Sequence, residues 1–538
     1  MRKYIFITLS IILLLTTACN KLTYDYPVTI IVDDEQPPVD SVDYSKYERG
    51  GALSLAICNF DTLNPILTKS STVADAMKLV FEPLFTLDSK QSAVPVLATG
   101  YTVSDDATAY TISLRNDISW HDGKYFDSED VEYTINAIKN NDSVYNFNTE
   151  KIASHYAIDK YTYFIKLSEP VANFVSILDF PIVKVNSDME PENTKYVPVG
   201  TGPYKYSTMT GMREVTLMAN GSWRGDANPA YIDKIVLKVL PSESSASFSF
   251  DSREVEVLTD DVAKLYEYVP KSNAVVHTYT SNAMCFLGIN FYNSVFWGKS
   301  TRQALQYVID KEEIVNNILL GHARIVEVPL NPQSWLHDGR SRVYYKDTAK
   351  SRELLEQDGW KYDVSENLYR RNLNGEEQTL QLKVLVNKDN SMRLNVAKSI
   401  VESLKEAGWS ATVKEVEFDE YIRLINEKDF DVFVGDISMA QNMDLSFLLG
   451  SSGNYFTYGS NEMDRYLLDA KTASNSEGVK RAYADIADLF TDDVPFVPIY
   501  FAEASLIYDF KIDGLVKPTV NNPYNNIHLW YVKTKNRR

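Results

Sequence analysis

Long apolar segments are almost absent from this chain of 538 residues. The one candidate, Tyr4–Leu15, follows the basic residues Arg2 and Lys3. At about 12 residues it has the length of a signal-peptide core and is too short to span a membrane. No later stretch approaches the roughly 18 apolar residues that a spanning helix needs. The sequence therefore predicts an exported protein whose body lies outside the lipid.

Cysteine is scarce, with three residues in all. Cys19 ends the small-residue run that begins at Thr16, and this site resembles a lipobox, in which the cysteine is diacylated and becomes the first residue of the mature protein. Thr16 departs from the leucine that is usual there, so ordinary signal cleavage with an incidental Cys19 is the alternative. Cys58 and Cys285 lie in apolar, strand-like runs, and the sequence leaves open a disulfide or two buried thiols.

Positive charge is also in deficit, because 54 Lys and Arg face 73 Asp and Glu, a formal net charge of −19. Such a balance argues against nucleic acid as a partner, because proteins that bind nucleic acid need basic faces. The 6 histidines are scattered, and the chain has no nucleophile elbow, zinc-protease motif or phosphate-binding loop. We expect no enzymatic activity, no cofactor and no metal site.

The organisation changes near residue 50. Residues 20–50 are rich in Asp, Pro and Val and predict an extended linker. From residue 51 onward the apolar patterning is regular and continues to the end. Nearly 490 residues exceed what one core usually organises, so we expect two or three domains.

A strand, a turn and a capped helix are predicted around residues 110–138. Tyr110–Arg115 alternates apolar and polar side chains, the period of a strand with one buried face. His121–Gly123 has turn chemistry, and Asp127 is placed to N-cap a helix whose inward face ends at Ile138. His121 beside Asp122 suggests a metal or acid–base pair, but the turn context favours a structural role.

Further helices are predicted at Arg302–Leu320, Asp347–Asp358 and Arg393–Ala407, each followed by glycine, and Ala411–Phe418 is an extended run. Alternation of helices and strands predicts an α/β protein with mixed sheets flanked by helices.

Several motifs together resemble family 5 of the extracellular solute-binding proteins, the peptide- and nickel-type receptors of bacterial ABC importers. They occur in the order of the family and span about residues 52–508. The motifs are Asp61–Pro65, Val80–Phe85, Trp120–Gly123, Gly200–Tyr204, Arg302–Leu305, Leu404–Gly408 and Asp429–Asp431.

The resemblance implies a two-lobed, periplasmic-binding-protein-like fold of type II with an extra subdomain in lobe one. The expected limits are a signal peptide at 1–19, a linker at 20–50, lobe one at 51–281, lobe two at 282–499 and a return to lobe one at 500–538. The subdomain is expected at about 91–194.

In peptide-binding members of the family the ligand lies extended between the lobes and pairs with protein backbone. The matching segments here are Thr68–Thr72 and Asp436–Ala440, with a third candidate after residue 499. The candidate ligand-binding residues are Lys69, Ser70, Ser71, Asp436, Ile437, Ser438, Tyr500 and Phe501. For each segment the alternative is a strand or loop packed within its own lobe.

One position departs from the pattern of the peptide binders. Their second segment carries an aspartate that pairs with the amino terminus of the peptide, and Ala440 stands at that position here. A desolvated ammonium without a carboxylate costs several kcal/mol. The hypothesis is that Asp436 or Asp444 takes over this role; otherwise the ligand has no free amine.

The expected function is that of a substrate-binding lipoprotein of an ABC importer, which captures an oligopeptide or a related solute. We expect a monomer in the cell envelope, periplasmic or extracytoplasmic, tethered to the membrane through Cys19 and delivering its ligand to a permease served by an ATPase. The alternatives are a helical surface lipoprotein that captures glycans, a binder of nickel, haem or another non-peptide solute, and a receptor without a permease.

Overall fold

The computed structural model describes residues 28–32, 47, 49–190, 196–224, 230–261, 273–337, 339, 344–366 and 368–533. The signal peptide and Cys19 lie outside these ranges. The predicted linker is wrong in one respect, because Val28–Val32 forms strand β1 and pairs in parallel with Ala274–Thr278 of β13. Its β-branched sequence suits a strand, and it covers an edge of β13 that would otherwise be open.

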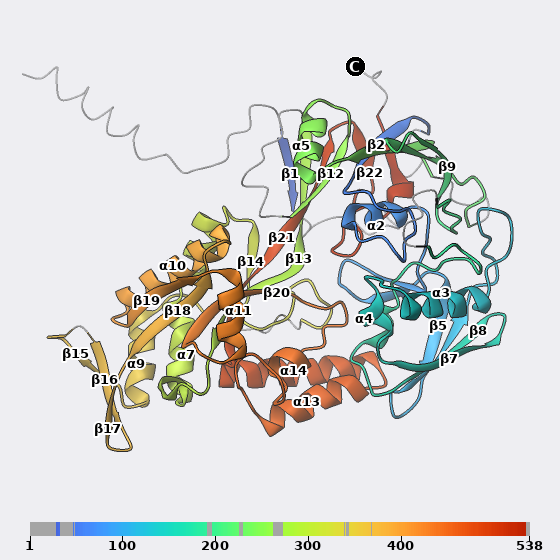
Figure 1. The fold of residues 1–538 in the computed structure, drawn as a ribbon. Helices are drawn as coiled ribbons and strands as arrows, with labels where there is room; N and C mark the ends of the chain where they lie inside the picture. Colours follow the sequence, from blue (N-terminus) through green and yellow to red (C-terminus); the bar gives the residue numbers. More distant parts are fainter. Residues whose placement is uncertain are drawn as a thin grey trace, which may run out of the picture.

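Two long antiparallel strands, β13 (Ala274–Ile289) and β21 (Phe496–Asp509), run through both lobes (Figure 1). They belong to a 12-stranded sheet with the path β19-β18-β20-β13-β21-β12-β2-β11-β10-β9. Their mutual register shifts between Thr280 and Met284, near the expected limit between the lobes. The expected limits at 281/282 and 499/500 fall within these two strands, and their placement stays a prediction.

Lobe one holds the half of the large sheet around β2 (Ala52–Cys58), which pairs in parallel with β11 and β12. The other elements of this part of the lobe are α2 (Ser71–Met77), β9 (Tyr204–Thr210), β10 (Glu214–Ala219), β11 (Lys234–Leu240), α5 (Glu243–Asp251), β12 (Val257–Asp261), β22 (Ile512–Gly514), η6 (Ile527–Leu529) and β23 (Trp530–Val532). Trp530 of the C-terminal segment is fully buried in the same core as Leu53 and Leu55 of β2, and the expected return of 500–538 to lobe one stays a prediction.

The subdomain of lobe one is a four-stranded antiparallel sheet, β5-β6-β8-β7, with helix α3 (Ser128–Asn140) packed on it. The predicted strand is β6 (Ala109–Leu114), and Asp127 caps α3 as predicted, with Asp130 closing a capping box. The remaining elements are β3 (Phe85–Leu87), β4 (Ala93–Pro95), β5 (Ala98–Val103), α4 (Asn146–Thr149), β7 (Ile152–Asp159), β8 (Thr162–Leu167) and η3 (Phe174–Ile177).

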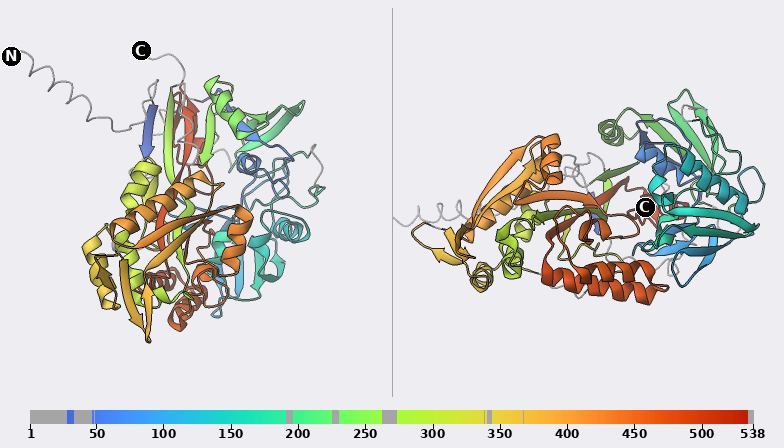
Figure 2. Two further views of the ribbon diagram at one scale, coloured as in Figure 1. Left: turned by 60° about the vertical axis from the view of Figure 1, so that its left-hand side comes forward. Right: turned by 60° about the horizontal axis from the view of Figure 1, so that its bottom comes forward.

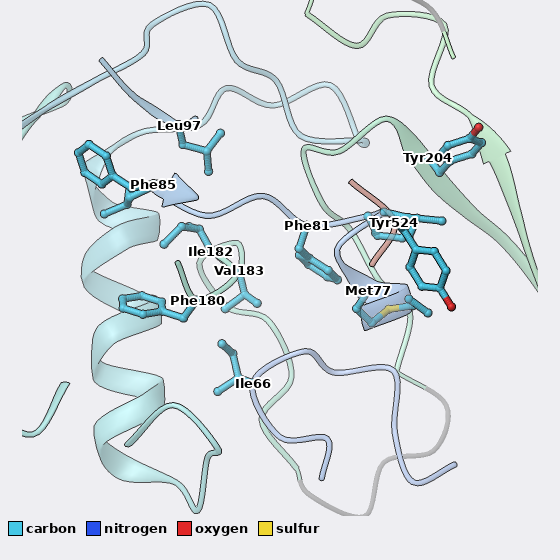
Figure 3. Packing of buried hydrophobic residues seen from close by; sticks show 14 of the residues in the cluster. Ile66, Met77, Phe81, Phe85, Leu97, Phe180, Ile182, Val183, Tyr204 and Tyr524 are labelled. Atoms are coloured by element: carbon cyan, nitrogen blue, oxygen red, sulfur yellow. The ribbon is translucent and has the colours of Figure 1, made fainter. Parts of the chain in front are cut away.

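One hydrophobic core joins this subdomain to the large sheet of lobe one. Figure 3 shows Phe180 and Ile182 beside α3, with Phe81 and Met77 continuing the packing toward Tyr204. Because the apolar contacts are continuous, we expect the subdomain and the rest of lobe one to move as one body.

Lobe two packs helices on both faces of its half of the sheet, and its two cores lie on these faces. The elements are η4 (Ser294–Phe296), α7 (Lys299–Val308), α8 (Lys311–Glu313), η5 (Ile314–Ile318), β14 (Ala323–Ile325), α9 (Thr348–Gln357), β15 (Lys361–Asp363), β16 (Leu368–Leu373), β17 (Glu376–Thr379), β18 (Gln381–Asn387), α10 (Ser391–Glu406), β19 (Ser410–Val416), α11 (Phe418–Asn426), β20 (Val432–Ser438), α12 (Ser446–Leu449), α13 (Asn461–Thr472) and α14 (Ser476–Asp493).

The helices predicted at Asp347–Asp358 and Arg393–Ala407 are present as α9 and α10. The single helix predicted at Arg302–Leu320 is wrong, because α7 ends at Val308 and Asp310 then caps a new turn, its carboxylate accepting from the amide of Glu313 at 2.9 Å. A capping aspartate competes with helix continuation.

This architecture contradicts the helical glycan-capture alternative, because a 12-stranded sheet organises the chain. Cys58 and Cys285, both among the described residues, are buried thiols that form no disulfide. In the described part of the chain, no helix is both long and apolar enough to cross a membrane.

Candidate ligand site between the lobes

The predicted ligand segment of lobe one is held against the end of β2. The carbonyl of Cys58 accepts hydrogen bonds from Ser70 Oγ at 2.6 Å and Thr72 Oγ1 at 3.2 Å, and its amide donates to Thr72 Oγ1 at 2.7 Å. Asp61 accepts from the amide of Lys69 at 2.6 Å. Ser70 also caps α2, its amide donates to Thr68 Oγ1 at 3.2 Å and its carbonyl accepts from the amide of Ala74 at 2.9 Å, so both its hydroxyl and its backbone serve the fold.

The side chains of Lys69 and Ser71 are exposed. Ser71 is exposed at the start of α2. The ammonium of Lys69 binds Asp142 of the subdomain, at 2.7 Å to the carbonyl and 2.9 Å to the carboxylate. Both partners are exposed to solvent, so this ion pair contributes little to stability and exchanges readily with a ligand anion.

A cavity of about 480 Å³ opens beside this segment, at the carboxyl end of β2. In open α/β sheets ligands bind at the carboxyl ends of parallel strands, which is where this cavity lies. Its walls come from β2, α2, α5, β12 and the C-terminal segment, and include Cys58, Asn59, Thr72, Ser244, Thr259 and Tyr524.

The predicted segment of lobe two is the end of β20. Cys285 of β13 pairs with Asp436, and Ala283 pairs with Ser438. Asp436 and Ser438 are exposed, while Ile437 between them is partly buried. Their burial alternates as the strand period requires, so two polar side chains face outward from the same side of β20.

Asp436 and Asp444 bind cations on different helices. The carboxylate of Asp436 accepts from Arg393 Nε at 2.8 Å, at the start of α10. Asp444 lies 3.3 Å from the ammonium of Lys471 on α13, and its other oxygen accepts from the amide of Ser446 at 2.9 Å. To receive a ligand amine, each aspartate therefore has to exchange its present cation, Arg393 or Lys471, for that amine.

Tyr500 and Phe501 lie in the interior of lobe two. Their exposed fractions are 4% and 0%, and β21 pairs here with Cys285 and Met284 on one side and with β14 on the other. The thiol of Cys285 bonds the side chains of both Tyr500 and Asp436, so Tyr500 lies one residue behind Asp436, whereas Phe501 packs in a core of lobe two. A ligand contact by either residue stays a prediction.

Direct contacts between the lobes involve residues that the sequence did not single out. Gln441 Nε2 donates to the carboxylate of Asp179 at 2.8 Å, and Asn173 Nδ2 donates to the carbonyl of Asn442 at 2.9 Å. Burial raises the pKa of Asp179 to about 6, and the nearby charge of Lys78 opposes this shift. No periodicity or motif marks these loop residues, so the sequence carried no signal for them.

His121 has a structural position, as its turn context suggested. Its Nδ1 accepts from the amide of Gly200 at 3.2 Å and its Nε2 lies 3.0 Å from the carbonyl of Gly202. This arrangement requires a neutral ring that donates from Nε2. Burial lowers the pKa of His121 to about 4, which agrees with the neutral form.

Comparison with known proteins assigns the architecture. Residues 92–457 match the model of the bacterial extracellular solute-binding proteins, family 5 Middle. The chain belongs to this family. It is therefore a solute-binding protein with the two-lobed fold that its elements show.

The relatives differ in their ligands. The oligopeptide-binding protein AppA of Bacillus subtilis is 24% identical over 514 residues, covering 91% of this chain and 93% of that protein. The heme-binding protein A of Haemophilus influenzae is 22% identical over 460 residues, covering 79% of this chain and 81% of that protein. Among the described residues, no group of three or more His, Cys, Asp or Glu is placed to hold a metal ion.

Solved structures agree on the fold. AppA of B. subtilis in complex with a nonapeptide superposes with a TM-score of 0.61 at 22% identity, covering 91% of this chain and 100% of that chain. A nickel ABC transporter protein of Bacillus halodurans superposes with a TM-score of 0.75 at 20% identity, covering 90% of this chain and 99% of that chain.

Proposed function

We propose that this solute-binding protein captures extended peptides between its lobes. The support from relatives is the oligopeptide-binding AppA, similar along almost the whole chain. The support from the structure is the geometry of β20, which presents a strand edge suited to an extended ligand.

The open edge of β20 carries the proposal. Strand β18 pairs with β20 at Val432 and Phe433, whereas β13 follows β20 as far as Ser438. From Gly435 to Ser438, the edge opposite β13 has no strand partner among the described residues. An exposed strand edge offers backbone donors and acceptors to an added strand, and a peptide satisfies them independently of its sequence.

In this proposal the opposite wall is the segment Lys69–Ser71 with its adjoining cavity of about 480 Å³, which lobe one alone lines. A ligand that pairs with β20 and fills this cavity contacts both lobes. It then favours the closed form, because only that form allows both sets of contacts. Residues Lys69, Ser70, Ser71, Asp436, Ile437 and Ser438 are the proposed ligand residues of the two walls.

The remaining partners follow from the import role. The closed form delivers its peptide to a membrane permease, and a separate ATPase supplies the energy. The protein works as a monomer outside the cytoplasm, held at the membrane by a lipid on Cys19. In this role the protein binds its ligand and releases it chemically unchanged.

The test is isothermal titration calorimetry with a defined nonapeptide and with the same peptide N-methylated at alternate residues. If the peptide pairs as a strand, methylation is expected to lower its affinity at least tenfold, because each lost backbone hydrogen bond costs about 1 kcal/mol. Exchanging one apolar side chain for another is the control and leaves the affinity within a fewfold. Binding of Ni(II)-histidine without binding of any peptide contradicts the proposal.

A further inference from the structure

A second cavity, which we call the seam cavity, lies between the subdomain and lobe two. It measures about 750 Å³ and has walls from both lobes. Figure 1 and the right-hand view of Figure 2 show α13 and α14 extending toward the subdomain, where the cavity lies. Lys69–Ser71 and Asp436–Ser438 do not line it, whereas Lys471, the partner of Asp444, does, so it adjoins the site at β20.

The lobe-one wall of the seam cavity is aromatic. The rings of Tyr110 and Phe174 have centroids 4.8 Å apart, and Tyr101 lies 6.2 Å from Tyr110. Tyr101 is 49% exposed, whereas Phe174 is 1% exposed. The wall therefore presents a partly accessible ring surface on a rigid base, which suits a flat apolar ligand.

The lobe-two wall supplies a further ring and an apolar floor. Trp335 lies on the loop after β14, and its amide donates to the carbonyl of Lys90 across the seam at 2.8 Å. Leu336, Met443 and Val479 are buried behind it. A ligand between Trp335 and Tyr101 thus touches both lobes.

Positive charge gathers at this cavity although the chain as a whole is strongly acidic. Lys471 is paired with Asp444. Among the described residues, no carboxylate lies within 4.0 Å of the ammonium of Lys90 or Lys480, and that of Lys480 sits 5.7 Å from the ring centre of Trp335.

One carboxylate, that of Asp88, also lines the cavity. Asp88 accepts from the amides of Lys90 and Ser92, both at 2.9 Å, within its own turn. Both bonds end on Oδ1, so backbone donors offset part of its charge. The lysines Lys90 and Lys480 remain to attract an anion, one from each lobe.

We propose that the seam cavity binds a small aromatic anion, a ring with a carboxylate or similar acidic group, between the lysines and aromatic rings of the two lobes. The ring packs against Tyr101 and Trp335, and the acid lies between Lys90 and Lys480. Because both lobes contribute, occupancy favours the closed form. The effect on peptide affinity rests on the proposed function; the binding itself does not.

The probe is 1-naphthoate, titrated calorimetrically into the full-length protein, with the neutral 1-naphthamide as the matched compound. We expect saturable 1:1 binding of naphthoate and at least tenfold weaker binding of naphthamide. In the variant Lys90→Ala/Lys480→Ala we expect naphthoate to bind at least tenfold more weakly. The control variant Lys160→Ala/Lys405→Ala removes one exposed lysine from each lobe away from the cavity and retains full affinity.

A Trp335→Leu variant tests the aromatic contact separately. It is expected to bind both naphthoate and naphthamide more weakly than wild type, by the same factor. Lack of saturable naphthoate binding, or equal binding by wild type and Lys90→Ala/Lys480→Ala, overturns the proposal. If naphthoate binds as expected but no peptide does, the seam cavity stands and the proposed peptide function fails. If both bind, saturating naphthoate is expected to tighten peptide binding severalfold.

Discussion

The side-chain amide of Gln441 donates a hydrogen bond of 2.8 Å to the carboxylate of Asp179, and this bond ties a loop of lobe two to the subdomain of lobe one. Gln441 directly follows Ala440, where the resemblance led us to expect an aspartate. A partly buried carboxylate is thus present next to this position, but lobe one supplies it.

The raised pKa of Asp179, about 6, makes the stability of the protein depend on pH. The native carboxyl binds its proton more tightly than the unfolded one, so its favourable contribution is complete below pH 3.8 and is lost as pH rises through about 6. We predict that Asp179→Asn raises the free energy of unfolding at pH 7.5 by on the order of 2 kcal/mol and has little effect at pH 4.

Urea unfolding at pH 4, 6 and 7.5 measures this difference between wild type and Asp179→Asn. The matched control is Asp105→Asn, an exposed carboxylate in a turn of the same subdomain. A difference that stays constant over the three pH values excludes Asp179 as the titrating group.

His121 gives a pH dependence of the opposite sign. Its pKa is lowered to about 4 by burial, so its neutral ring stabilises the fold above pH 6.5, and this contribution is lost as pH falls toward 4. We predict that His121→Ala lowers the free energy of unfolding by about 2–4 kcal/mol at pH 7.5, because a cavity forms and two partly buried hydrogen bonds are lost. The cost is expected to shrink at pH 4.5.

Thermal unfolding of His121→Ala and wild type at the two pH values checks this expectation. His121→Asn is the conservative variant, since its side chain retains a hydrogen-bonding group but does not titrate. Equal destabilisation by His121→Ala at pH 7.5 and pH 4.5 means that the imidazole does not control the acid sensitivity of this region.

Local patterns explain why the region around α3 was predictable. The strand β6, the turn at His121 and the cap at Asp127 each depend on neighbours within a few residues, and alternation and capping chemistry specify them directly. The break after α7 was missed because Leu305, Ile309 and Ile314 keep an approximate helical spacing across it, while the deciding cap at Asp310 acts against that pattern.

The contact between Asp179 and Gln441 joins residues 262 positions apart, on loops without periodicity. Nothing in the local sequence encodes such a pair, since it depends on how the two lobes meet. The segments Thr68–Thr72 and Asp436–Ser438 were named from a resemblance, and the structure adds what the resemblance lacked: the ion pair of Asp436 with Arg393 and the open edge of β20.

Gly200 occupies a position where no side chain fits. A Cβ there would lie 1.8 Å from the carbonyl oxygen of Val80. Because that atom is backbone, the clash is relieved only by moving the chain that carries the core of lobe one. We predict that Gly200→Ala costs at least 3 kcal/mol in the free energy of unfolding or prevents folding.

Gly100→Ala is the matched control, because a Cβ at Gly100 meets nothing within 4 Å. The soluble yield and the midpoint of urea unfolding compare the two variants. A Gly200→Ala protein as stable as Gly100→Ala shows that the close approach to Val80 relaxes without cost.

Recognition of the ligand amine is testable at Asp436 and Asp444. If either carboxylate receives the amino terminus of a peptide, then Asp436→Asn/Asp444→Asn is expected to bind a free-amine peptide at least tenfold more weakly than wild type, because a desolvated ammonium loses its charged acceptor. The N-acetylated peptide is expected to bind wild type as weakly as the free-amine peptide binds the double variant, and the two substitutions are expected to leave the affinity for the acetylated peptide unchanged.

Asp419→Asn/Asp469→Asn, which removes two exposed carboxylates of the same lobe, controls for the change in net charge. The assignment is wrong if calorimetry shows that acetylation leaves the affinity of wild type unchanged, or that Asp436→Asn/Asp444→Asn binds the free-amine peptide as tightly as wild type does. Asp179 is then the next carboxylate to substitute.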